Sequence, residues 1–304
     1  MSVKKKTLTS IAVVCCAAVL LIVFFVNARE IRRKNISPDG VISNSDAVIA
    51  SIRQGLRDHS ARMTVTFSYD RDILSEIPRF VNAWMAAAVE ETGSPVEGDY
   101  IRYQCGGYES TTSCDRADGS YTFTVQIVPQ YYMYLAQEEA VTEKLWEIFD
   151  GFGFDGDTSD YDKIRAIYDY MCSRVKYDKI HVKNKYYCLR STSYAALIQE
   201  TATCQGYSVA LYRMLRQAGI NARIITGIGH GENFDGFHAW NIAQLDGVYY
   251  NLDATWDAGK DEYSYFLKGK DGFTGHVPGE EFTANMFMEQ YPISETNFVF
   301  PIDG

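Results

Sequence analysis

The sequence predicts an α+β protein, because helical and strand patterns alternate along the chain and one strand pair carries a hairpin signal. The chain has 304 residues, of which 46% are hydrophobic and 14% aromatic. It can therefore bury a substantial core, and its length favours two folded units. Apolar residues at helical spacing give way several times to strict alternation. Asp246-Gly247 between two such runs is typical of a tight hairpin turn.

Residues 1–34 are predicted to be a membrane-targeting segment. Lysines precede an apolar run from Ile11 to Val26, and arginines follow it. Counted from Leu8, the run approaches the roughly 20 residues that cross a bilayer as a helix. A single-pass anchor is favoured over a signal peptide cleaved after residue 28, because the basic cluster resembles an anchor's flank.

The anchor would bind the protein to the membrane, and by analogy the bulk of the chain is expected outside the cytoplasm. Cleavage at residue 28 would instead release a secreted protein. Basic residues on both sides leave the orientation open. Residues 35–46 contain Pro, Gly and Ser with little apolar content, so they are predicted to be a linker.

The charge balance argues against nucleic acid as a partner. Residues 35–304 hold 22 basic and 38 acidic side chains, a net charge of −16. Of seven cysteines, five lie in this part, without the regular spacing of a disulfide scaffold or a zinc site. Cys105 and Cys114 could bridge a loop in an oxidising compartment.

Residues 47–156 are predicted to form a small α+β domain of unknown role. Apolar residues at helical spacing begin at Ala47, and alternation over Met63–Tyr69 predicts a strand. A second helix is expected over Ile77–Ala88, followed by strands around Tyr100–Gln104 and Tyr121–Ile127. We find no chemical constellation in this region.

Residues 157–304 open with Ser159 and Asp162, spaced like a capping box before a helix that runs to Val175. A short helical pattern follows at residues 194–198. Thr203 is then a natural N-cap for a helix that Gly219 ends. This places Cys204 in the first turn, where unpaired amides and the helix dipole favour a thiolate and can hold an oxyanion. A cysteine seen alone, however, is more often a small buried hydrophobe.

The predicted hairpin brings a histidine and a carboxylate together. With a two-residue loop at Asp246-Gly247, Trp240 lies opposite Asp253, and His238 shares their face as a diagonal neighbour. A four-residue loop keeps this relation, whereas an odd loop moves Asp253 to the other face. A cysteine at a helix start, a histidine on a strand and an acid on its partner strand are the parts of a nucleophile, a base and an orienting group.

The other histidines are weaker candidates. His230 competes for the role of base, but its flanking glycines predict a flexible loop. His181 and His276 have no partner that the sequence identifies, so each is expected to be at the surface or structural. The acidic residues Asp257, Asp261 and Glu262 are expected in a solvated loop.

Three motifs together resemble the transglutaminase-like superfamily, of the membrane-anchored type found in bacteria. They are Cys204-Gln205-Gly206-Tyr207, His238-Ala239-Trp240-Asn241 and Asp253-Ala254-Thr255-Trp256, in the family's order. The resemblance covers roughly residues 161–267. It implies a papain-like fold, in which a nucleophile helix packs on an antiparallel sheet, and a catalytic triad of Cys204, His238 and Asp253.

In that chemistry the Cys204 thiolate attacks a carboxamide or peptide carbonyl and forms a thioester, which an amine or water resolves. The expected substrate is therefore a protein or peptide. Trp240, Trp256 and Tyr207 are expected to pack the sheet against the helix, and Gly206 to permit close approach. A donor from Gln205 is a weaker expectation.

No cofactor is needed for this chemistry, and no calcium loop or other metal site is evident. A cysteine peptidase or amidase acting on protein or cell-wall peptide would use the same three residues. A third alternative is a catalytically silent binding or scaffold domain. Silent relatives would be expected to lose the cysteine or the histidine.

Overall fold

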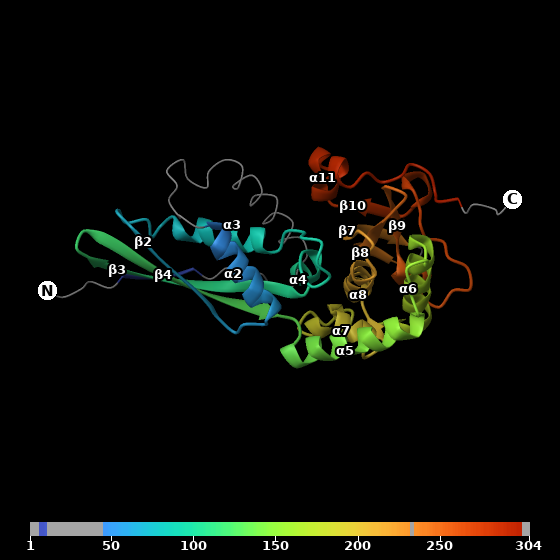
Figure 1. The fold of residues 1–304 in the computed structure, drawn as a ribbon, viewed down its shortest axis with the longest axis horizontal. Coiled ribbons are helices and arrows are strands. Elements are labelled where there is room, and N and C mark those ends of the chain that lie inside the picture. The colour runs from blue at the N-terminus through green and yellow to red at the C-terminus, as the bar shows by residue number, and fades with distance from the viewer. Residues whose placement is uncertain (1–5, 11–44, 232–233, 300–304) are drawn as a thin grey trace. The chain divides into compact units, whose positions relative to one another are not determined.

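The computed structural model describes residues 6–10, 45–231 and 234–299. These residues form two compact units, each described here by itself (Figure 1). The first unit combines residues 1–92 with Cys105–Tyr131, and the second combines Gly93–Gln104 with residues 132–304. The chain therefore passes from the first unit to the second, returns to the first, and then enters the second unit again.

In its described residues, the first unit is an antiparallel sheet with two helices. The strand order is β1-β3-β4-β2. Its elements are β1 (Lys6–Ser10), α2 (Ser45–Arg57), β2 (Met63–Tyr69), α3 (Ile77–Ala88), β3 (Cys105–Ala117) and β4 (Ser120–Tyr131). The predicted helix at Ala47, the strand at 63–69 and the helix at 77–88 are confirmed.

The helices of the first unit pack on its sheet through aromatic contacts and hydrogen bonds. Trp84 of α3 meets Phe67 of β2 edge to face, with ring centroids 6.1 Å apart. The Tyr108 hydroxyl of β3 donates to the Asn82 side chain of α3. Buried and half-buried residues alternate along β4, as expected for a strand that buries one face.

The second unit surrounds a four-stranded antiparallel sheet of order β10-β7-β8-β9. The strands of this sheet are β7 (Ala222–Gly231), β8 (Phe234–Leu245), β9 (Val248–Leu252) and β10 (His276–Pro278), and the helices of the unit are α4 (Asp99–Arg102), α5 (Leu135–Phe152), α6 (Asp160–Arg174), α7 (Ser193–Leu197), α8 (Cys204–Gln217), α9 (Ala254–Asp257), α10 (Glu280–Thr283) and α11 (Asn285–Gln290). The other elements are β5 (Lys176–Tyr177), η1 (Cys188–Ser191), β6 (Thr201–Ala202) and η2 (Lys270–Gly272).

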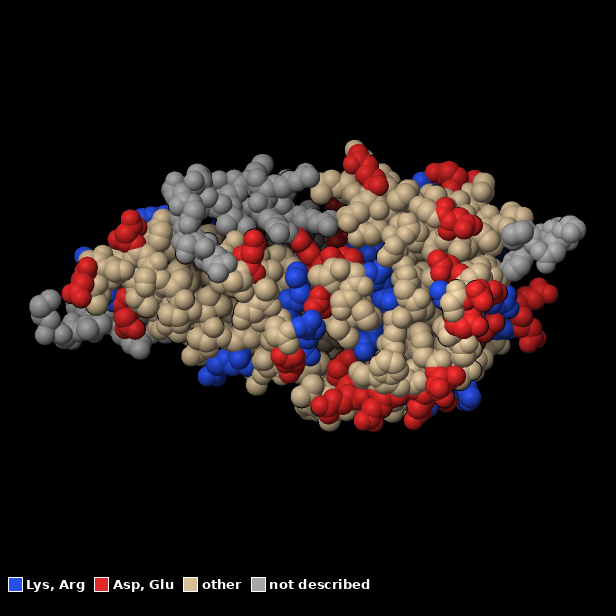
Figure 2. Space-filling view, viewed as in Figure 1, with Lys and Arg blue, Asp and Glu red and all other residues tan. Residues whose placement is uncertain are grey.

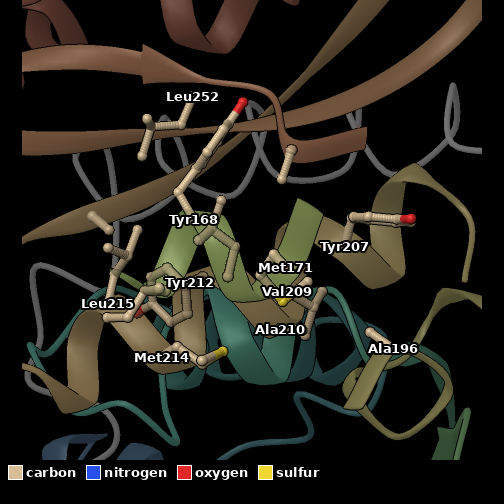
Figure 3. Packing of buried hydrophobic residues seen from close by; sticks show 14 of the residues in the cluster. Tyr168, Met171, Ala196, Tyr207, Val209, Ala210, Tyr212, Met214, Leu215 and Leu252 are labelled. Atoms are coloured by element: carbon tan, nitrogen blue, oxygen red, sulfur yellow. The ribbon is translucent and has the colours of Figure 1, made fainter. Parts of the chain in front are cut away.

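Helix α8 is the centre of the second unit's larger core. Figure 3 shows its residues Val209, Tyr212 and Met214 packed with Tyr168 and Met171 of α6. Apolar residues from one face of the sheet join the same cluster. A second cluster covers the other face with residues of α10 and α11. Buried on both sides, the sheet is a rigid platform for the side chains at its edge.

Acidic side chains gather on the exposed face of α5. Glu139, Glu143, Glu147 and Asp150 are all exposed. In Figure 2 acidic side chains follow the edge of the molecule where α5 lies in Figure 1. The opposite face of α5 buries Val141, Leu145 and Ile148 in the core of the second unit. This two-sided pattern is why the negative net charge does not prevent packing.

The units divide at positions other than the boundary at residue 156 that composition suggested. Residues 93–104 and 132–156 pack with the second unit, because α5 fills its core and Asp99 pairs with Arg223 of β7. The strand expected around Tyr100–Gln104 is wrong, since Asp99–Arg102 is one helical turn. A segment this short fits both the helical and the strand pattern of apolar residues. The buried contact of Asp99 with Arg223 favours the helical turn here.

Two further expectations concern the N-terminal half: a membrane-spanning run and a bridge between Cys105 and Cys114. The apolar run from Ile11 to Val26 lies outside the described residues, while Leu8, from which the span was counted, lies in β1. Among the described helices, none is both long and apolar enough to cross a membrane. Cys105 and Cys114 stand nine residues apart on one strand, roughly 30 Å, so they cannot bridge to each other.

Candidate active site

Cys204 is the first residue of α8, as predicted, and its side chain is buried. The residue just before it is held in place by Arg190, because the Thr203 amide donates to the Arg190 carbonyl at 2.9 Å. Thr203 stands at the N-cap, but its hydroxyl also turns to Arg190 and does not cap the helix. The first amides of α8 therefore remain outside the helix's own hydrogen-bond ladder.

The start of α8 is packed too tightly for any side chain at position 206. A Cβ on Gly206 would lie 2.8 Å from the Ala202 Cβ and 2.9 Å from the Arg190 oxygen. One residue later, the buried Tyr207 hydroxyl donates to the Val175 carbonyl. These contacts fix the position of Cys204. The expected reason for a glycine at this position, close approach, is confirmed.

The hairpin has the predicted register. Leu245 pairs with Val248, and the ladder between β8 and β9 ends at the pair Asn241 and Leu252. Asp253 comes directly after this last pair. His238 Nε2–H donates to Asp253 Oδ2 at 2.7 Å, and the two side chains are 2% and 1% exposed. A tight turn thus joins two residues that are 15 positions apart.

Asp253 is also the N-cap of α9. Its Oδ1 accepts the backbone N–H groups of Thr255 at 3.0 Å and Trp256 at 3.2 Å. Burial opposes its charged form, but the charge of His238 and hydrogen bonds from His238 and His276 outweigh burial and lower the pKa of Asp253 to about 2. The carboxylate is therefore ionised at any working pH.

His238 faces Cys204 with its other ring nitrogen. Since Nε2 is committed to Asp253, the hydrogen bond between His238 and Cys204 leaves Nδ1 for the thiol. Burial lowers the pKa of His238, but the Asp253 charge and hydrogen bonds to Asp253 and Cys204 outweigh it and raise the value to about 10. The structure thus brings all three predicted side chains together, with a cationic imidazole beside the thiol.

A fourth side chain joins them that the sequence did not reveal. His276 Nε2 lies 2.9 Å from Asp253 Oδ2, and its side chain is fully buried, so of the two expected places, surface or structural, the surface is wrong. It stands 23 positions after Asp253, in a segment without clear periodicity. No spacing signal could have paired the two.

The remaining histidines lie apart from this cluster. His230 is in strand β7 and not in a loop, but its half-exposed ring pairs with the exposed Asp235 at 3.1 Å. His181 hydrogen-bonds to Asp178 at 2.9 Å. Neither pairs with Asp253 or Cys204 in these hydrogen bonds, so His230 is not supported as the base.

Several neighbours differ from their expected roles. Trp256 stacks on His238, with centroids 4.8 Å apart, instead of packing the sheet against the helix. Trp240 packs in the core on the other face of the sheet. Gln205 donates one N–H of its side-chain amide to the Tyr103 carbonyl at 2.6 Å. Asp257 is buried and accepts from the Tyr168 hydroxyl, so it does not lie in a solvated loop.

Among the described residues, His238, Asp253 and His276 bring atoms of metal-ligand type within 4.8 Å of one another. Hydrogen bonds of 2.7 and 2.9 Å already join these atoms and are a sufficient reason for their approach. We therefore treat the three residues as a hydrogen-bonded cluster. A thiol, an imidazole and an orienting carboxylate in this order can support nucleophilic attack on a carbonyl.

The segment that holds Cys204, His238 and Asp253 matches a known family. Residues 152–254 match the model of the transglutaminase-like superfamily. The kyphoscoliosis peptidases of Mus musculus and Homo sapiens are 30% and 29% identical to this chain over 109 residues. The match spans 33% of this chain and only 16% of those proteins.

Among solved structures, a crystal structure described as a TGase is 18% identical, with a TM-score of 0.36, over 50% of this chain and 45% of that chain. The family match covers α6 to the start of α9, and so includes Cys204, His238 and Asp253. Residues 152–254 of this chain are therefore a domain of the transglutaminase-like superfamily.

Proposed function

We propose that the protein is a thiol-dependent acyltransferase in which Cys204 is the nucleophile, His238 the acid and base, and Asp253 the group that orients His238. The observation that carries the proposal is the chain of contacts from the thiol at the start of α8 through His238 to Asp253. A buried imidazole with a raised pKa is the counter-ion that a reactive thiolate needs.

In the first half-reaction the Cys204 sulfur bonds to the carbonyl carbon of a glutamine side chain. The oxyanion that forms lies near the first amides of α8, which are suited to stabilise it. The carbon–nitrogen bond then breaks, and the His238 Nδ1 proton passes to the departing nitrogen. Ammonia is released, and the acyl group remains on Cys204 as a thioester. Asp253 keeps the ring oriented while its charge changes.

In the second half-reaction an amine attacks the thioester carbon and gives its proton to His238. The carbon–sulfur bond breaks, and the product is a new amide, with the Cys204 thiolate and the His238 imidazolium restored. Water in place of the amine gives a carboxylate, which is hydrolysis. The same residues serve both outcomes, so the acceptor that reaches the thioester decides between them.

Peptide-bond hydrolysis is the second candidate function. The observation in its favour is that the curated relatives matched over 109 residues are named peptidases. In that case the bond that Cys204 attacks is a backbone amide, and the departing group is a peptide amine. A protein or peptide is the substrate in both functions.

The first experiment is alkylation of the protein with iodoacetamide across pH 4–9, with peptide mapping to follow each cysteine. We expect Cys204 to label at pH 6 almost as fast as at pH 8, and roughly 100-fold faster than Cys188 at pH 6, because a thiolate paired with an imidazolium persists in acid. Cys172 should be slow, since burial raises its pKa.

His238→Ala should remove the fast reaction at pH 6, and His230→Ala, a half-exposed histidine on the neighbouring strand, should leave it unchanged. Equal rates at Cys204 and Cys188 in the wild-type protein would refute the enzyme and favour a binding scaffold. If Cys204 is activated, a glutamine-containing protein with a labelled primary amine tests transfer, and product carboxylate tests hydrolysis.

We also propose that the catalytic unit lies outside the cytoplasm, tethered through the apolar run that begins at Ile11. Its support is the sequence pattern alone. A tag at the C-terminus should then be digested by protease added to intact cells, and the protein should resist alkaline extraction from membranes. Protection of the tag in intact cells would overturn the placement.

A further inference from the structure

We propose that His276 is a positioning residue of this site: a second imidazole, protonated on both nitrogens, that holds the Asp253 carboxylate and offsets its charge. The inference deepens the proposed function, because it concerns the same three residues. It gives a role to a buried histidine for which the sequence offered no partner.

Asp253 has no acceptor capacity left over. Its Oδ1 accepts two backbone N–H groups, from Thr255 and Trp256. Its Oδ2 accepts from two imidazoles, His238 at 2.7 Å and His276 at 2.9 Å. Two acceptor sites on each oxygen are thus filled. The carboxylate cannot rotate without breaking hydrogen bonds at both oxygens.

The partners of His276 assign its protons. Its Nδ1 lies 3.0 Å from the Thr274 carbonyl oxygen, which can only accept. Its Nε2 lies 2.9 Å from the Asp253 oxygen, which also only accepts, because this carboxylate already accepts from His238 and from two backbone N–H groups. Both ring nitrogens must therefore donate. An imidazole that donates twice is a cation.

The surroundings of His276 suit a cation. The Phe273 ring stacks on it at 3.9 Å between centroids, and Trp256, Trp240 and Tyr265 lie at 4.3, 5.0 and 5.3 Å. Aromatic rings within about 6 Å attract a cation through their π faces. Among the described residues, Asp253 is the carboxylate that hydrogen-bonds to the ring, and the titratable rings beside it are His238 and Tyr265, each at 5.3 Å between centroids.

The backbone is shaped to present this ring. Gly275 has a φ of +77°, a conformation that favours glycine, and its carbonyl accepts the His230 amide at 2.7 Å. A Cβ there would lie 2.7 Å from the His230 oxygen. The turn places His276 opposite Gly229 at the edge strand of the sheet. His276 thus reaches Asp253 from the side of the sheet opposite to β9.

The charge of His276 should affect the proton affinities of His238 and Cys204. Removing a cation 5.3 Å from His238 exposes His238 and Cys204 to the whole charge of Asp253. Loss of the thiol proton and loss of the imidazolium proton then both become harder. Both limbs of the alkylation profile of Cys204 should move to higher pH, by about one unit.

The test compares His276→Gln with His276→Phe by the pH profile of Cys204 alkylation, in buffers that contain a chelator. The glutamine amide can still donate to Asp253 but carries no charge, so both limbs should shift upward with the maximal rate nearly kept. The phenylalanine keeps the ring in its cage but donates nothing, so the maximal rate should also fall. His230→Gln is the matched control and should reproduce the wild-type profile.

A profile of His276→Gln that superimposes on the wild-type profile would overturn the proposal. Should the variants not fold, ¹⁵N NMR of the wild-type imidazoles decides the question without them. Both nitrogens of His276 are expected to be protonated at neutral pH, and a single protonated nitrogen would refute the assignment. Because this readout does not depend on Cys204, it still decides the role of His276 if the thiol is unreactive and the proposed function fails.

Discussion

At the scale of single residues, the site depends on a carboxylate that only accepts. An asparagine at position 253 can still accept the two α9 amides through its oxygen. Its NH₂ group, however, would face two imidazole N–H groups, at His238 and His276, with no acceptor between them. The shape of the side chain is kept, but its hydrogen-bonding direction at Oδ2 is reversed.

Asp253→Asn is therefore expected to slow Cys204 alkylation at pH 6 by roughly 100-fold or more, because His238 loses both its orientation and its charge partner. The comparison is with Asp235→Asn, an exposed acid that pairs with His230, which should label like the wild-type protein. An Asp253→Asn protein that is folded and labels at the wild-type rate would show that Asp253 does not orient the base.

The same substitution predicts a pH-dependent loss of stability. The pKa of His238 is raised from 6.5 to about 10 in the folded protein, so its stabilisation is complete below about pH 6.5 and is lost as the pH rises through 10. The pKa of Asp253 is lowered, so its stabilisation is present above about pH 4. The gap in urea stability between wild type and Asp253→Asn should be widest near pH 6 and narrow toward pH 10. A gap that is constant with pH would contradict this linkage.

The contacts of these residues could be predicted from the sequence only where a recognisable pattern, such as a hairpin turn, joins the two partners. The pairing of His238 with Asp253 followed from the Asp246-Gly247 turn, because one turn fixes the register of a whole hairpin. His276 reaches Asp253 through a turn at Gly275 and a three-residue strand, and neither has a periodic signal. The buried state of Asp257 was missed for the same reason, since its partners are a tyrosine 89 positions away and two loop amides.

At the scale of elements, the position of Cys204 depends on how closely α8 approaches the segment that precedes it. Gly206→Ala would drive a methyl group against the backbone oxygen of Arg190 and the Ala202 side chain. We expect a loss of about 1–3 kcal/mol of stability and slower alkylation of Cys204, because the first turn must shift. The measurements are urea denaturation and the alkylation rate.

Gly151→Ala, near the end of α5, is the control for Gly206→Ala. A Cβ at Gly151 meets nothing within 4 Å, so alanine should be neutral or stabilising by up to about 1 kcal/mol, with unchanged alkylation. If Gly206→Ala behaved in the same way, the tight approach at the start of α8 would not determine the position of Cys204.

The elements themselves were predicted well where the pattern was long. The helices at 77–88 and 204–217 and the strands that flank Asp246-Gly247 all follow from periodicity over several turns or pairs. The segment Asp99–Arg102 is only one turn long, and the interaction of Asp99 with Arg223 determines its conformation. A contact across 124 positions is outside the reach of any local pattern.

At the scale of the whole molecule, the second unit is assembled from two stretches of chain. The Tyr132 amide donates to the Gln104 carbonyl at 3.0 Å, so the two stretches meet where residues 105–131 leave the unit. A chain from Gly93 to Gly304 with a two-glycine link in place of residues 105–131 is expected to fold and to alkylate Cys204 like the full protein.

The contrasting chain is residues 157–304, the domain that composition suggested. It lacks α5, whose Val141 and Leu145 are completely buried, and it leaves Arg223 buried without the Asp99 carboxylate. Losing one partner of a buried ion pair costs about 3–5 kcal/mol, so we expect this chain not to fold cooperatively. Circular dichroism during urea denaturation would distinguish the two chains, and cooperative folding of residues 157–304 would refute the boundary.

The two-part construction of this unit also sets an order of events during synthesis. Asp99 leaves the ribosome 124 residues before Arg223, the partner that its carboxylate holds at 2.7 Å. At about 5–20 residues per second, the wait lasts roughly 6–25 s. During that time the hairpin of β3 and β4 is complete, while Gly93–Gln104, the stretch that leads into it, has no surface to pack on. The second unit therefore closes only after most of the chain has emerged, and the hydrogen-bonded cluster around Asp253 is complete only when His276 has been made.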